Sequence, residues 1–280
     1  MERIKHAIAR AKQERQQQHT VARVAPAIDD AKSQAGATNG AGESWAADPI
    51  PTVPVDRRHL QDMRIVAHDG SEGHSAHFDM LRTQVLQRLE AASQKVVAIT
   101  SPRSGCGKTV TAINLAMSIA RQIEQGVLLV DLDLRKPQIA RYLGLQPTAG
   151  IGDVIAGRCS PSEAMLVPDL CGHRLTVLAA PNAVPSPAEQ IVSSTMRTIM
   201  KGLRKDPRYR IIIFDLPPML SSDDFLAFLP QVDAALLVAS AGETTVHDIA
   251  ECERLIDPDK LLGCVLNKVA ETDGDYHYYS

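Results

Sequence analysis

The stretch KVVAITSPRSGCGKTVT, residues 95–111, decides the fold of this chain. It opens with the apolar run 96–99, which is typical of a central parallel strand. Two glycines, a lysine and a threonine follow with the spacing of a phosphate-binding loop, or P-loop: Gly105, Gly107, Lys108 and Thr109. Glycine lets backbone N–H groups approach a phosphate closely, and the helix that begins here directs the positive end of its dipole toward it. The stretch therefore predicts a buried strand, a nucleotide-binding loop and a helix.

The residues of this loop have distinct expected roles. The loop departs from the P-loop consensus GxxxxGK[ST] at one position, where Pro102 replaces the first glycine. Lys108 is expected to reach the β- and γ-phosphates, and the Thr109 hydroxyl to ligate Mg²⁺. Cys106 is expected to act as a small residue that offers its backbone N–H, with a redox-sensitive thiol as the alternative. We expect seven consecutive residues to contact the nucleotide: Ser104, Gly105, Cys106, Gly107, Lys108, Thr109 and Val110.

Strand and helix patterns alternate along the rest of the chain. Apolar runs predict strands at 126–131, 175–179, 210–215, 234–239 and 262–269, and helical spacing predicts helices at 76–92, 187–205 and 245–255. This alternation predicts an α/β fold with a mostly parallel sheet and helices on both faces. Ligands in such sheets bind at the carboxyl ends of the strands. At one such end, Asn267 could read the nucleotide base through its amide or could form a turn.

Carboxylates follow two of the predicted strands. Asp131 and Asp133 stand at the end of one strand, and Asp215 ends another. Phosphoryl transfer from a Mg–nucleotide needs oxygen ligands for the metal and a base for the attacking hydroxyl. We expect Asp215 and Asp131 to hold the metal together with Thr109, and either Asp131 or Asp133 to be the base. Arg135 is expected to counter charge or clamp a phosphate. Aspartate also favours turns after strands, which is the alternative reading.

Composition narrows the class of protein. The chain has 280 residues and a formal net charge of −3, which argues against nucleic-acid binding by bulk electrostatics. No apolar run approaches the ~20 residues that would span a bilayer, and the first residues lack the apolar core of a secretory signal. The five cysteines are an odd number and form no CxxC pair, which favours reduced thiols in the cytosol.

The chain divides into four predicted segments. Residues 1–18 form a basic helical segment that either docks on a partner or anionic lipid or is a solvated helix. Residues 19–73, rich in Ala, Gly, Pro and Ser, are expected to be a flexible linker. Residues 74–270 form the nucleotide-binding domain. Residues 271–280 form a polar tail that holds three of the five tyrosines, Tyr276, Tyr278 and Tyr279.

Residues 76–280 resemble the bacterial tyrosine kinases of capsule and exopolysaccharide biosynthesis, in the form whose cytoplasmic kinase is a separate chain. The most specific matches are VLLVDLDLRKP, which carries the family's DxDxR motif, and IIIFDLPPML, its Walker B motif with the trailing Pro-Pro. The resemblance implies a P-loop NTPase fold like that of the partition ATPases, with ATP and Mg²⁺ as cofactors. It also implies autophosphorylation of the C-terminal tyrosine cluster, Tyr276, Tyr278 and Tyr279.

The resemblance implies partners as well. They are a membrane-embedded polysaccharide co-polymerase that activates the kinase, a tyrosine phosphatase and further copies of the chain. No nucleic-acid partner is expected, because the sequence of the nucleotide-binding domain shows no concentrated basic surface. The protein is then expected in the cytoplasm, at the inner face of the cell membrane through its partner. The family's ring-forming Glu-Arg-Arg positions correspond here to Ala76, Asp79 and Arg82, so only the last matches and a ring is in doubt.

Two functions are compatible with these features. The first is an ATP-dependent protein-tyrosine autokinase whose tail enters a neighbouring subunit. The second is an ATP-gated dimerising switch that regulates or localises a membrane polysaccharide machine without phosphorylating tyrosine. Arg103 keeps the second function open, because it stands where partition ATPases place a lysine that reaches across a dimer.

Overall fold

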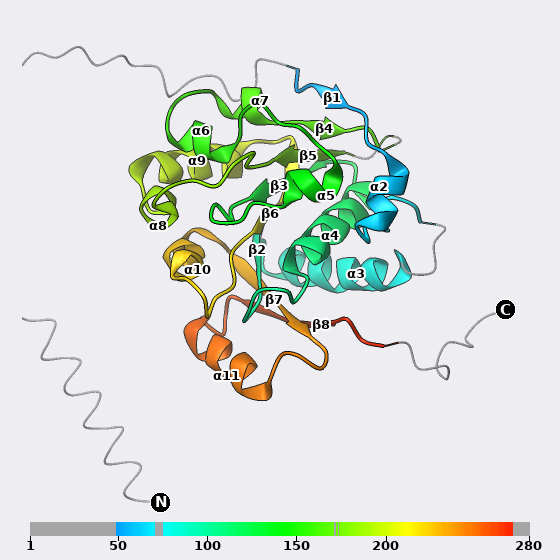
Figure 1. Cartoon of the computed structure of the whole chain (residues 1–280), viewed down its shortest axis with the longest axis vertical. Helices are drawn as coiled ribbons and strands as arrows, with labels where there is room; N and C mark the ends of the chain where they lie inside the picture. The colour runs from blue at the N-terminus through cyan, green and yellow to red at the C-terminus, as the bar shows by residue number, and fades with distance from the viewer. Residues whose placement is uncertain (1–48, 71–74, 171, 173, 271–280) are drawn as a thin grey trace, which may run out of the picture. The chain divides into compact units, whose positions relative to one another are not determined.

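A six-stranded parallel sheet with the order β5-β3-β6-β2-β7-β8 forms the centre of the molecule (Figure 1). The computed structural model describes residues 49–70, 75–170, 172 and 174–270, which belong to one compact unit, Ala41–Ser280. The strands are β2 (Val96–Thr100), β3 (Gly126–Asp131), β5 (Leu175–Leu178), β6 (Tyr209–Asp215), β7 (Ala234–Ser240) and β8 (Leu261–Asn267). All six predicted strands are confirmed, with ends that differ by at most two residues.

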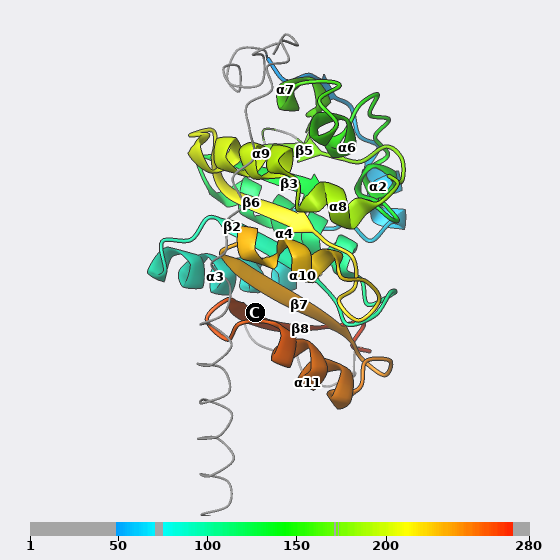
Figure 2. The same cartoon turned by 90° about the vertical axis from the view of Figure 1, so that its left-hand side faces the viewer.

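Helices cover both faces of this sheet, as the alternating pattern predicts (Figures 1 and 2). In β2, Val97 and Ile99 join the core under one helical layer, whereas Val96 and Ala98 join the core under the other. The first layer contains α2 (Arg57–Asp62), α3 (Ser75–Ala91), α4 (Lys108–Gln122) and α5 (Ile139–Leu143). The second contains α6 (Ile151–Ile155), α7 (Pro161–Ala164), α8 (Pro187–Ile191), α9 (Ser194–Lys205), α10 (Asp224–Phe228) and α11 (Val246–Leu255), with the short 3₁₀ helix η1 (Leu229–Gln231) after α10.

The single helix predicted over 187–205 is wrong, because the structure has two helices there, α8 and α9. α8 ends at Ile191, with Val192 as its C-cap. Ser193 then adopts an extended backbone, and its hydroxyl accepts a hydrogen bond from the N–H of Met196. A serine in this position satisfies a donor at a helix start and so begins a new helix. The apolar spacing continues through the break, which is why periodicity alone does not reveal it.

Residues 49–70 also differ from the prediction, which assigned them to a flexible linker. The two-residue strand β1 (Thr52–Val53) pairs in parallel with β4 (Val167–Pro168), and Leu60 of α2 is fully buried. The Asn114 side chain of α4 accepts hydrogen bonds from the N–H groups of Val66 and Ala67. Side chains of the domain thus fix a segment that has little periodicity of its own. We call residues 49–70 the N-terminal strap.

The other predicted segments fall outside the described residues. They are the basic segment 1–18, the linker residues before 49 and the tyrosine-containing tail 271–280. Of the helices that the structure does describe, none combines the length and apolar character needed to cross a membrane.

Candidate nucleotide site

The three motifs meet where neighbouring strands end. The P-loop follows β2, Asp131 ends β3 and Asp215 ends β6, the strand between them. In the sheet register, Asp215 stands opposite Ile99 on one side and opposite Asp131 on the other. The parallel sheet therefore brings together residues that are more than a hundred positions apart, at the edge where such folds bind ligands.

Lys108 lies among the carboxylates that the sequence singles out. Its Nζ atom is 2.9 Å from Oδ2 of Asp133 and 3.4 Å from both carboxylate oxygens of Asp215. The Thr109 hydroxyl donates a hydrogen bond of 2.6 Å to Oδ2 of Asp215. Burial by itself would lower the pKa of Lys108, but the negative charges of Asp215 and Asp133 raise it above its usual value. The ammonium group is therefore held in its charged form.

Asp131 is fully buried, and its two oxygens differ. Oδ2 accepts hydrogen bonds of 2.9 Å from the backbone N–H groups of Gln138 and Ile139, whereas Oδ1 has no hydrogen-bond partner among the described residues. Burial, followed by the charge of Asp215, raises the pKa of Asp131 to about 8. Burial likewise raises the pKa of Asp215, against the opposing effect of Lys108.

These side chains suit a hard divalent cation. Three carboxylates face one lysine, and the buried oxygen of Asp131 is left without a donor. Within the described residues, no three His, Cys, Asp or Glu side chains converge closely enough to hold a metal by themselves. A metal bound here would therefore need ligands from outside the protein. Mg²⁺ suits such a site because it keeps several waters and takes further ligands from substrate phosphates. Thr109, Asp131 and Asp215 are the residues placed to contribute.

The P-loop backbone is held from the far edge of the sheet. Gly105 and Gly107 both have φ of +89°, which glycine adopts without strain. The amide nitrogen of Asn267, at the end of β8, donates a 3.0 Å hydrogen bond to the carbonyl of Cys106. A Cβ on Gly107 would stand 2.1 Å from that nitrogen. The Asn267 oxygen accepts from the N–H of Lys268, so both ends of the amide have partners in the chain, which favours the turn-forming role over base reading.

The remaining loop residues occupy unequal environments. Cys106 is buried, and its sulfur lies 3.6 Å from the hydroxyl of Thr244. Ser104 and Gly105 are exposed, whereas Val110 is half-buried and packs against the core under the first helical layer. The surroundings of Cys106 fit a small packed residue whose backbone faces the ligand.

Two arginines at the site have acidic partners that sequence reasoning missed. Arg103 Nη2 is 2.8 Å from Oδ1 of Asp248 in α11, and its hydrogen bonds hold the pKa of Asp248 far below the usual range. Arg135 Nε is 2.6 Å from Oδ2 of Asp224, the first residue of α10. The acidic pair Asp223 and Asp224, a few residues after the Walker B motif, was the available signal.

The positions that bear on ring formation are engaged within the chain. Asp79 of α3 is 2.7 Å from Arg82 on its own helix and 2.5 Å from Arg121 of α4. Ser118 of α4 donates a 2.6 Å hydrogen bond to the same carboxylate. Arg82 Nη1 also donates to the hydroxyl of Ser118 at 3.0 Å, so its guanidinium is engaged within the chain.

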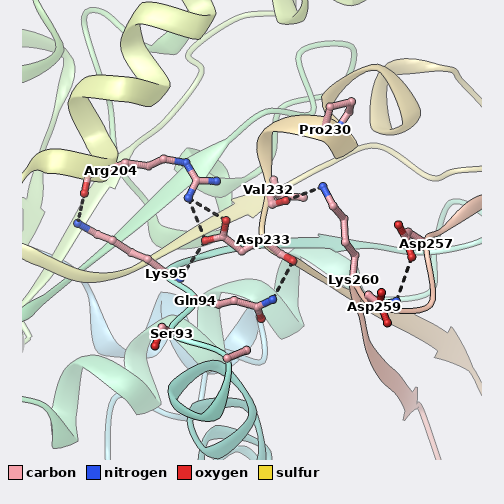
Figure 3. A pocket seen from close by; sticks show the side chains of 11 residues that line it. Ser93, Gln94, Lys95, Arg204, Pro230, Val232, Asp233, Asp257, Asp259 and Lys260 are labelled. Carbon is pink, nitrogen blue, oxygen red and sulfur yellow. Dashed lines mark hydrogen bonds and ion pairs between the residues drawn. The ribbon is translucent and has the colours of Figure 1, made fainter.

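A hollow of about 590 Å³ lies at the opposite end of the strands, before β2 and β7 (Figure 3). Its cations are matched within the chain. Lys95 donates to the carbonyls that end α9, and Arg204 lies 2.8 Å from Asp233. Lys260 donates to the carbonyls of Leu229 and Val232. These contacts explain the hollow as a structural junction, away from the P-loop.

Comparisons with known proteins identify the family and the fold. Residues 92–267 match the family model described as NUBPL iron-transfer P-loop NTPase. The tyrosine-protein kinase YwqD of Bacillus subtilis is 32% identical over 208 residues, which cover 73% of this chain and 86% of that protein.

Two solved structures are similar as well. The VpsO kinase domain is 30% identical with a TM-score of 0.59, and the alignment covers 70% of this chain and 97% of that domain. The chimerical protein CapA2B2 is 25% identical with a TM-score of 0.68, and the alignment covers 80% of this chain and 95% of the chimera. The chain belongs to the bacterial tyrosine-protein kinases of capsule and exopolysaccharide biosynthesis, whose P-loop NTPase fold is that of the partition ATPases.

Proposed function

We propose that this protein is an ATP-dependent tyrosine autokinase that regulates exopolysaccharide or capsule production by phosphorylating its C-terminal tyrosines in trans. The observation that carries the proposal is the cluster of Lys108 with Asp131, Asp133 and Asp215 beside the P-loop. A P-loop with this many carboxylates can bind a Mg–nucleotide and accept a proton from a hydroxyl. Three tyrosines in the last five residues supply such hydroxyls: Tyr276, Tyr278 and Tyr279.

Phosphate binding, metal binding and proton acceptance fall to different residues of the cluster, and the surroundings of each residue support its role. Lys108 binds the β- and γ-phosphates, and its two acidic neighbours keep it charged. Thr109, Asp131 and Asp215 hold Mg²⁺, which neutralises the phosphate charge when bound. The base is Asp131 or Asp133. The Oδ1 atom of Asp131 has no hydrogen-bond partner among the described residues, so it is open to accept a proton, and this supports Asp131. Asp133 is the carboxylate nearest to Lys108 and therefore close to the phosphate to be transferred.

A membrane-embedded activator is part of the proposal. The similar CapA2B2 structure is a chimera of two named parts, which supports a kinase of this type working with a second protein. A stand-alone kinase would then reach the inner face of the membrane through that partner, and a phosphatase would reset the tail.

The test is phosphorylation of the tail. The full chain is incubated with Mg-ATP and the cytoplasmic segment of its activator, and the C-terminal peptide is examined by mass spectrometry. We expect phosphate on one or more of the three tyrosines, and none in Lys108→Met. Lys136→Met is the matched control, because Lys136 is exposed in the loop before α5. An unmodified tail in the wild-type chain under these conditions overturns the kinase.

A second function, the ATP-gated switch, rests on Arg103. Arg103 lies in the P-loop, and its side chain is 65% exposed even though it pairs with Asp248, so it could contact a second copy of the chain. Replacing the three tail tyrosines by Phe separates the two functions, since the switch keeps polysaccharide production and the kinase loses its phosphorylation cycle. ATP-dependent dimerisation that Arg103→Ala abolishes would favour the switch.

A further inference from the structure

Arg135 and Asp224 make a two-point contact at the carboxyl edge of the sheet. Nε of Arg135 donates to Oδ2 of Asp224 at 2.6 Å, and Nη2 donates to Oδ1 at 3.0 Å. Two parallel bonds of this kind fix the plane of a guanidinium as well as its position. Asp223, the preceding residue, lies 3.9 Å from the same arginine but is 78% exposed. Asp224 therefore sets the orientation of Arg135, and Asp223 contributes little to it.

The contact is unequal in burial. The side chain of Asp224 is 1% exposed, whereas that of Arg135 is 46% exposed. A buried carboxylate is destabilising unless its charge is matched, and here both of its oxygens bind Arg135. The guanidinium uses one edge for Asp224 and keeps the donors of Nη1 outside this contact. An arginine held in this way is rigid on one side and available to an anion on the other.

The place of the contact connects it to the site. Arg135 stands two residues after Asp133, in the loop that leaves β3, and Asp224 begins α10 after β6. β3 and β6 are neighbours in the sheet, so the contact joins the two loops that also carry the proposed base and metal ligands. Arg135 and Asp133 are close enough for their charges to interact.

We propose that Asp224 is a positioning residue, which orients Arg135 so that the guanidinium binds the phosphoryl group while it moves from ATP to tyrosine. The proposal rests on the proposed kinase function and assigns that function a residue outside its three motifs. Negative charge spreads over the phosphoryl oxygens during transfer, and donors that are already oriented stabilise it most. The γ-phosphorus–oxygen bond to ADP breaks, the bond to the tyrosine oxygen forms, and the tyrosine proton passes to the carboxylate base.

A double-mutant cycle tests this role in the full chain with its activator and Mg-ATP. Arg135→Ala is expected to lower kcat by about 100-fold, and Asp224→Asn by about 10-fold, with ATP affinity changed by less than about 3-fold. In the Arg135→Ala background, Asp224→Asn should lower kcat no further, because it acts through Arg135. Asp223→Asn is the matched control and should stay within about 2-fold of wild type. Effects that multiply in the double variant overturn the proposal.

Arg135→Lys covers the case in which Asp224→Asn does not fold. Lysine keeps the charge and can pair with Asp224 but cannot make the two-point contact. We expect Arg135→Lys to lose most of the kcat that Arg135→Ala loses, and full activity in Arg135→Lys overturns the proposal. If the wild-type chain phosphorylates no tyrosine, the proposed kinase function is refuted, and the positioning role of Asp224 is tested separately. The same cycle is then measured on phosphate release from Mg-ATP, where independent effects of the two residues again overturn the positioning role.

Discussion

Lys108 and Asp133 form an ion pair of 2.9 Å at the floor of the P-loop. The lysine that is expected to bind phosphate is therefore already bound to a carboxylate, so nucleotide has to compete for it. Asp133→Asn weakens this competition, because it leaves Asp215, 3.4 Å away, as the charged partner of Lys108. We expect ATP affinity to be unchanged or a few-fold tighter, while kcat for tyrosine phosphorylation falls by about 100-fold or more if Asp133 is the base. Fluorescent-nucleotide titration and phosphorylation rates measure the two effects, with Asp257→Asn, at the other end of the sheet, as control.

The two oxygens of Asp131 predict opposite results for two substitutions. Asp131→Ala leaves the N–H groups of Gln138 and Ile139 without their acceptor, and should lower the free energy of unfolding by about 2–4 kcal/mol. Asp131→Asn keeps an acceptor oxygen for these N–H groups, and it removes a carboxyl group whose charged form burial disfavours, since burial raises the pKa of Asp131. It should change stability by less than about 1 kcal/mol and still abolish phosphorylation. Urea unfolding without nucleotide or metal measures the two free energies of unfolding. Equal losses of stability in Asp131→Ala and Asp131→Asn contradict this account.

Gly105 and Gly107 share the same backbone conformation but not the same surroundings. Nothing lies within 4 Å of a Cβ on Gly105, whereas a Cβ on Gly107 would collide with the amide of Asn267. Gly105→Ala adds backbone strain of about 1 kcal/mol. Gly107→Ala adds the same strain and also displaces Asn267 from the Cys106 carbonyl. We expect Gly107→Ala to weaken ATP binding by at least about 10-fold more than Gly105→Ala. Similar affinities for the two variants would show that Asn267 does not hold the loop.

The pair between Arg103 and Asp248 predicts a pH dependence. Hydrogen bonding to Arg103 lowers the pKa of Asp248, so its stabilisation is complete above the unfolded pKa of about 4, declines as the pH falls below that value and is fully lost only below the lowered pKa of the folded state. Urea midpoints of wild type and Arg103→Ala should differ at pH 7 and converge toward pH 3. Arg141→Ala is the control, since its guanidinium binds the neutral amide of Gln138. A difference that grows at low pH contradicts the assignment.

Asn114 should be one of the most sensitive polar positions of the fold. Its oxygen accepts from Val66 and Ala67, and its amide donates to the carbonyl of Arg64 at 3.0 Å. Asn114→Ala leaves these buried and partly buried groups unpaired and should lower the free energy of unfolding by about 2–4 kcal/mol. Thr83→Ala, at an exposed position of α3, should change it by less than about 0.5 kcal/mol. Chemical denaturation compares them, and a small effect at Asn114 would mean that water replaces its contacts.

Most of the sheet was predictable because its strands other than the edge strand β8 are buried on both faces. β2, β3 and β7 are continuous apolar runs. Helical segments separate them in the sequence, and this alternation predicts parallel strands. The clustering of Asp131 and Asp215 was predictable for the same reason, since the ends of parallel strands share an edge.

The features that could not be predicted are individual side-chain contacts, for which the sequence offers several equivalent partners. Arg135 could have paired with any acid near the edge, and only the three-dimensional path of α10 selects Asp224 over Asp223. The break at Ser193 depends on one hydroxyl, and the strap depends on one amide, Asn114. Single hydrogen bonds of this kind leave no periodic signal in a sequence.

The strap also decides where this kinase can be cut. Leu60 and Ile65 are completely buried against the layer that contains α4 and α5. A fragment that starts near residue 74, where composition places the domain boundary, would expose that surface to water. It would also leave Asn114, six residues into the helix that begins at Lys108, without its three partners in the strap. An expression fragment of the catalytic domain should therefore start before residue 49.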